Sequence, residues 1–81
     1  PSEVLHFNGE VKEIGDGNLL VTYLSTADGF MELSDGDYVM STDNLLDEVQ
    51  EGDVVTIWFG GIILETAPAQ LTNVYRIEKA E

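Results

Sequence analysis

The chain contains no cysteine, and this absence removes several kinds of protein from consideration. Disulfide bonds, thiolate nucleophiles and cysteine-based zinc sites are all excluded. Long hydrophobic runs are missing too, because none approaches the ~20 apolar residues that a membrane-spanning helix needs. We therefore expect no direct membrane insertion by this segment, and no signal-peptide pattern opens it.

Basic residues are scarce, since three Lys and Arg stand against sixteen Asp and Glu, which gives a net charge of −13. Such a chain repels the phosphates of nucleic acids and the headgroups of anionic lipids. Nucleic-acid binding is therefore not expected, and the expected partner is a protein or a cationic ligand. Solubility is the simpler explanation of the acidity, because net charge keeps a small domain dispersed.

The chain of 81 residues is long enough for one domain, predicted over residues 1–81, and 43% of it is hydrophobic. Residues 4–14 alternate between apolar and polar side chains, as in a half-buried strand. Gly9 interrupts this run and predicts a bulge or a sharp bend. The turn sequence at residues 16–18 predicts a hairpin with a second strand at residues 19–24.

Further strands are predicted at residues 38–41, 54–59, 62–64 and 71–78. The pair Gly60-Gly61 predicts a tight hairpin between the two central runs, since glycine readily adopts the positive φ of such turns. The pair Asp35-Gly36 predicts a smaller hairpin between residues 30–33 and the strand at 38–41.

One short helix is predicted within residues 42–51, because Leu45, Leu46 and Val49 form an apolar stripe and Gly52 follows as a stop. A wide loop is the alternative. The last run repeats apolar residues every three positions, which a flat strand cannot place on one face. We favour a helical turn at residues 69–72 after Pro68, and a β-bulge near Asn73 is the alternative.

Together these elements predict an all-β fold, a small five- to six-stranded OB-like (Greek-key) barrel with one short helix or helical turn near residues 43–50. A barrel removes strand edges that a short β-rich chain would otherwise expose. We expect a monomer. A partly open meander or a sandwich is the alternative architecture.

The residues offer little for catalysis. His6 is the only imidazole, no Ser lies in a nucleophile context, and sixteen carboxylates make any carboxylate pair unspecific. We therefore expect no catalytic residue, a non-enzymatic function and no cofactor.

Calcium is the alternative ligand, because Asp-Gly turns are rich in oxygen and calcium takes six to eight oxygen ligands. Asp35 and Asp37 are the candidate ligands of a weak calcium-binding module. No EF-hand loop is present, since Val39 and Leu46 stand where its ligands would fall. Hairpin-turn chemistry by itself accounts for these turns.

Four residues in the last third of the chain are candidates for a binding site: Trp58, Glu65, Gln70 and Arg76. Trp58 is either half-exposed, as at binding hot spots, or buried at the end of the barrel. Arg76, the only arginine, is expected to have a carboxylate partner, and Glu65 is the candidate. Gln70 is expected to satisfy backbone groups near Pro68.

Residues 52–74 also carry a recognisable pattern, in which Gly-Asp-Val precedes a strand, a Gly turn follows, and Glu-Thr-x-Pro-Ala-Gln occupies residues 65–70. This pattern resembles the YobA-like domains of unknown function in secreted proteins and lipoproteins of Gram-positive bacteria. The resemblance implies an OB-like barrel outside the cytoplasm, anchored through a lipid on a removed N-terminal segment, and it implies no activity. Ala67 departs from the family, which usually has an aromatic residue there.

Overall fold

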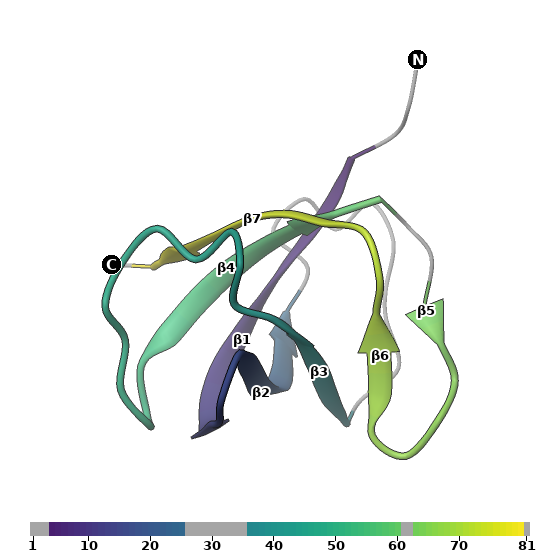
Figure 1. Ribbon diagram of the computed structural model, residues 1–81, viewed down its shortest axis with the longest axis horizontal. Helices are drawn as coiled ribbons and strands as arrows, with labels where there is room; N and C mark the ends of the chain where they lie inside the picture. The colour runs from purple at the N-terminus through teal and green to yellow at the C-terminus, as the bar shows by residue number, and fades with distance from the viewer. Residues whose placement is uncertain (1–3, 26–35, 61–62, 81) are drawn as a thin grey trace.

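Seven β-strands form the regular structure in the computed structural model, which describes residues 4–25, 36–60 and 63–80 (Figure 1). All seven belong to one mixed sheet, and the described residues contain no helix, so the all-β class is confirmed. Within these ranges there is accordingly no helix long and apolar enough to cross a lipid bilayer. The strands are β1 (Leu5–Ile14), β2 (Asn18–Ser25), β3 (Asp37–Ser41), β4 (Val54–Phe59), β5 (Ile63–Leu64), β6 (Ala69–Leu71) and β7 (Val74–Lys79).

The strands lie in the order β5-β6-β3-β2-β1-β4-β7. Neighbours are antiparallel except β3 and β6, which run parallel. Although β6 and β7 lie toward opposite ends of this order, only Thr72 and Asn73 separate them in the chain (Figure 1). Three backbone steps span at most roughly 11 Å, so the sheet must curve until its two halves approach each other.

Alternation along the strands places one set of side chains in a common core. In β4, for example, Val55, Ile57 and Phe59 are buried, whereas the residues between them are only half-buried. The centroid of the Phe7 ring lies 5.5–5.8 Å from the ring centroids of Tyr23, Tyr38 and Phe59. The buried core residues are Phe7, Val11, Leu19, Val21, Tyr38, Met40, Val55, Ile57, Phe59, Leu71 and Ile77.

Gly9 lies beside an irregularity in strand pairing, as its position predicted, although the bulged strand is β2 and not β1. Asn8 pairs with Ser25 and Gly9 pairs with Tyr23, so Leu24 of β2 is the extra residue. A Cβ atom built on Gly9 would lie 3.0 Å from Val21 Cγ2 and 3.1 Å from the carbonyl oxygen of Thr22. The close approach of the two strands therefore requires a residue without a side chain at this point.

The turn residues predicted the hairpins with mixed success. β1 and β2 pair across the turn at residues 15–17, as predicted. The hairpin across residues 60–61 is wrong, because β4 pairs with β1 and β7, whereas β5 pairs with β6. The Gly60 N–H instead donates to the carbonyl oxygen of Asn73 at 2.8 Å. The hairpin predicted around Asp35-Gly36 involves residues 30–35, which lie outside the described ranges.

The helix predicted within residues 42–51 is wrong, and the wide loop is what forms. Part of this loop, residues 44–47, runs along the edge of β7, and we call it the edge strap. The Leu46 N–H donates to the carbonyl oxygen of Ile77 at 3.0 Å, and the Ile77 N–H donates to that of Asn44 at 3.1 Å. Leu45 and Val49 are half-buried against the core, so an extended chain satisfies the spacing that suggested a helical face.

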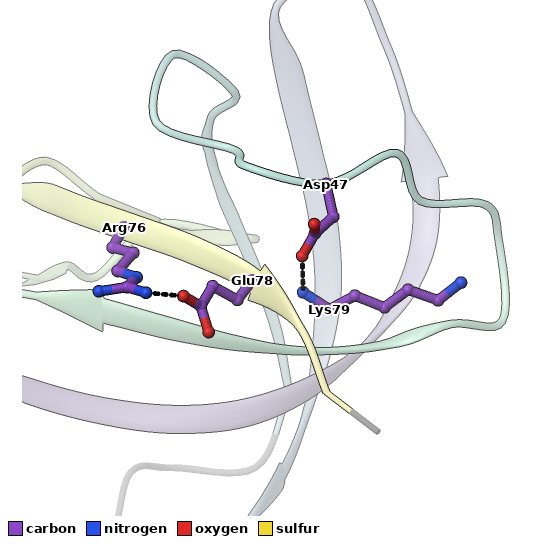
Figure 2. Close-up of polar contacts among 4 residues, drawn as sticks. All are labelled: Asp47, Arg76, Glu78 and Lys79. Atoms are coloured by element: carbon purple, nitrogen blue, oxygen red, sulfur yellow. Dashed lines mark hydrogen bonds and ion pairs between the residues drawn. The ribbon is translucent and has the colours of Figure 1, made fainter.

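Side chains complete this cover of β7. The Asn44 side-chain amide donates to the carbonyl oxygen of Val74 at 2.7 Å. The Lys79 N–H donates to the Asp47 carboxylate at 3.0 Å (Figure 2). An open strand edge is a template for pairing with another chain, and the edge strap occupies it.

The helical turn favoured at residues 69–72 is wrong, because Ala69–Leu71 is β6 and its backbone pairs with β3. The alternative, a bulge, is correct in kind but lies beyond Asn73. In the pairing of β4 with β7, Phe59 lies opposite Val74 and Trp58 lies opposite Arg76, so Tyr75 is the extra residue. This bulge positions the candidate site.

Candidate functional site

A row of three side chains crosses the outer face of the sheet on β1, β4 and β7. His6 is the register partner of Trp58, which in turn is the register partner of Arg76. The His6 and Trp58 rings are stacked, with centroids 5.6 Å apart and an interplanar angle of 21°. The Arg76 Cζ atom lies 5.3 Å from the centroid of the Trp58 ring. Because β1 and β7 flank β4 on opposite sides, His6 and Arg76 approach the indole from opposite sides.

The next row holds polar groups on the same three strands. Thr56 donates its hydroxyl hydrogen to Asn8 Oδ1 at 2.7 Å, and Glu78 is the register partner of Thr56. The Glu78 carboxylate accepts a hydrogen bond from the Arg76 guanidinium (Figure 2). The cation of Arg76 therefore lies between an aromatic ring and a carboxylate, both of which stabilise positive charge.

The bulge in β7 adds a second aromatic residue beside this row. Tyr75 and Arg76 are adjacent in the chain and both are exposed, because the extra residue breaks the alternation that would otherwise bury one of them. The Tyr75 hydroxyl lies over Gly60, where a Cβ atom would approach it to 2.9 Å. A larger residue than glycine at position 60 would thus displace the Tyr75 ring or the neighbouring Asn73.

A surface depression lies beside Trp58, and Tyr75 and Val4 contribute to its lining together with Arg76 and Glu78. Val4 is 50% exposed and Tyr75 is 48% exposed. Apolar groups are thus accessible next to a charged pair. We call the whole surface the Trp58 face; it consists of Val4, His6, Trp58, Tyr75, Arg76 and Glu78.

No protein-family model, no curated protein and no solved structure matches this chain.

The structure brings together two of the four residues predicted for a binding site. Trp58 and Arg76 are in contact, whereas Glu65 follows β5 and Gln70 lies in β6, which pairs with β3. The expected ion pair between Glu65 and Arg76 is wrong, because Arg76 pairs with Glu78 two residues along the same strand. Arg76 nevertheless has the carboxylate partner that was expected.

Gln70 acts near Pro68 through an intermediate group. Its side-chain amide donates to the Thr66 hydroxyl at 3.3 Å, and that hydroxyl donates to the carbonyl oxygen of Pro68 at 2.6 Å. The role predicted for Gln70 is therefore filled by Thr66, which makes the direct contact with the backbone, and Gln70 contacts the Thr66 hydroxyl.

Asp37, one candidate calcium ligand, already has two partners. Thr22 donates its hydroxyl hydrogen to Asp37 Oδ1 at 2.9 Å, and Lys12 Nζ lies 3.6 Å from Oδ2. Asp35, the other candidate, lies outside the described residues. Within residues 4–25, 36–60 and 63–80, no group of three metal-ligating side chains is found.

Sequence reasoning missed His6, Tyr75 and Glu78 as members of the site. His6 is half-buried and stacked on Trp58. Glu78 could have been proposed from its spacing to Arg76, because residues two apart share one face of a strand. Tyr75 could not, because regular alternation would place it on the opposite face from Arg76.

Proposed function

We propose that this protein is a non-enzymatic binding domain whose protein partner docks on the Trp58 face. The observation that carries this proposal is the position of Trp58 outside the core, held between His6 and Arg76. Contacts on both sides limit the freedom of the indole, so little side-chain entropy is lost when a partner covers it. Trp, Tyr and Arg are also the residues most enriched at binding hot spots.

The pairing of strands supports an OB-like Greek-key barrel as the scaffold. Strands β1, β2 and β3 follow one another in antiparallel order, and β4 returns to lie beside β1, as in a Greek key. The last strand of such a barrel would be divided into β6, which pairs with β3, and β7, which pairs with β4. On this scaffold the Trp58 face lies on the convex outer side of β1, β4 and β7.

The resemblance to the YobA-like domains supports a location outside the cytoplasm, with attachment through a lipid on a removed N-terminal segment. The edge strap supports a monomer, because it occupies the edge of β7 that could otherwise pair with a second copy. The charge of −13 supports a protein partner or a cationic ligand over a nucleic acid.

The test compares Trp58→Ala with Ile14→Ala in the recovery of partners from the extracytoplasmic fraction of the source organism. Ile14 is a matched control, because it is an apolar residue, 45% exposed, at the other end of β1 from His6. A true partner is one whose recovery fails with Trp58→Ala and is retained with Ile14→Ala.

Titration of that purified partner then gives the magnitude. A hot-spot residue contributes about 2 kcal/mol or more, so Trp58→Ala should weaken binding by about 30-fold or more. Thermal melts must show that both variants are folded. Equal affinity of the wild type and Trp58→Ala would refute the proposal, and so would equal losses in the two variants.

A further inference from the structure

The Trp58 face already holds a cation of its own. The guanidinium of Arg76 lies against the indole of Trp58 and donates a hydrogen bond to the Glu78 carboxylate, which is its counter-ion. An aromatic face combined with a carboxylate is a chemical environment that selects cationic groups. Arg76 therefore shows, in the free protein, that this surface can accommodate a basic side chain.

Arg76 is held there only weakly. The Arg76 side chain is 54% exposed, and the side chain of its partner Glu78 is 30% exposed. Exposed ion pairs and exposed cation–π contacts are both weak interactions. The long stem of Arg76 can turn toward solvent without disturbing the backbone of β7, so displacement of this side chain requires little free energy.

Displacement of Arg76 leaves a defined vacancy. The Glu78 carboxylate then lacks its counter-ion, and one side of the Trp58 indole is uncovered. The depression lined by Val4 and Tyr75 extends from this position and offers apolar contact for a hydrocarbon stem. Lys and Arg combine an apolar stem with a cationic head, which matches both parts of this vacancy.

We infer that the group docking on the Trp58 face is a Lys or Arg side chain of a basic protein partner, which replaces Arg76 against Trp58 and Glu78. This inference rests on the proposed function. The charge of −13 supports it, because a long-range negative field attracts basic proteins and raises their rate of association. Arg76 then acts as an internal competitor for the position.

A short arginine peptide, acetyl-Gly-Arg-Gly-amide, tests this exchange directly. The chain contains one Trp, so the indole N–H signal in an NMR titration reports on this site alone. The same peptide with Gln in place of Arg is the control ligand, at matched ionic strength. Wild type should bind the arginine peptide weakly and the glutamine peptide not at all.

Three variants make the test specific. Arg76→Gln removes the internal competitor and should tighten binding of the arginine peptide about three- to tenfold. Glu78→Gln removes the counter-charge and should weaken it about threefold or more. Glu10→Gln is the matched control, because Glu10 is exposed on β1 and pairs in register with Val54, away from the Trp58 row. It should leave the affinity unchanged.

Other outcomes overturn the inference in distinguishable ways. Weaker binding to Arg76→Gln would mean that Arg76 is itself a contact residue, and equal losses in Glu78→Gln and Glu10→Gln would mean that only net charge matters. No shift of the indole signal with the peptide in wild type or Arg76→Gln also overturns it. In each case the proposed function stands or falls separately, on the partner affinity of Trp58→Ala.

Discussion

Replacement of Gly9 with alanine should destabilise the protein through a clash that the structure defines. The added Cβ atom would lie 3.1 Å from the backbone oxygen of Thr22, and 3.0 Å and 3.1 Å from two side-chain atoms of Val21. The Val21 side chain is fully buried, and the Thr22 oxygen belongs to β2, so neither can move freely. Relief of the clash therefore requires the two strands to separate near the bulge.

The size of the effect follows from two opposing contributions. Overpacking of a core costs about 1–3 kcal/mol, and the reduced freedom of the unfolded chain offsets about 0.4–1 kcal/mol of that. The net loss of unfolding free energy should be about 1–2 kcal/mol, out of roughly 4–12 kcal/mol for a domain of this size. In a thermal melt this corresponds to a decrease in Tm of about 5–15 °C.

Gly15→Ala is the matched control. No atom lies within 4 Å of a Cβ built on Gly15, and the φ angle of Gly15 is not positive, so alanine can adopt this backbone conformation. Only the effect on the unfolded chain remains, so this variant should be about 0.4–1 kcal/mol more stable than wild type. Urea unfolding followed by Trp58 fluorescence measures both variants. Equal stability of Gly9→Ala and Gly15→Ala would refute the clash predicted at Gly9.

Two further predictions concern the edge strap and metal ions. Asn44→Ala removes the hydrogen bond to the Val74 carbonyl and should lower the unfolding free energy in urea by about 0.5–1.5 kcal/mol. Leu46→Ala should stay within about 0.5 kcal/mol of wild type, because Leu46 is 60% exposed; the reverse order would contradict the role of the strap. In thermal melts, sodium chloride should raise Tm by screening the −13 charge. If the Asp-Gly turns bind no metal, the Tm in calcium should equal the Tm in magnesium at the same ionic strength. A higher Tm in calcium that is lost in the double variant Asp35→Asn, Asp37→Asn would establish a calcium site.

The sequence pattern predicted the structure correctly where residues close in sequence determine it. The alternation of β4 and the hairpin between β1 and β2 follow from side-chain period and turn chemistry. Gly9 marked the irregular point in the pairing of β1 with β2, although its position did not show that the extra residue lies in β2. The two helical predictions failed for a common reason. The chain at residues 44–47 and at residues 69–71 uses its backbone hydrogen bonds to pair with β7 and β3, and those partners are distant in sequence.

The candidate site divides in the same way. The sequence by itself identified Trp58 and Arg76, because a lone Trp and a lone Arg in so acidic a chain are conspicuous, and it determined the net charge of −13. Only the tertiary structure decided that His6 stacks on Trp58 and that Arg76 pairs with Glu78 instead of Glu65. The physical reason is strand register. A bulge of one residue at Tyr75 sets which side chains of β7 lie beside β4, and no local pattern encodes that alignment.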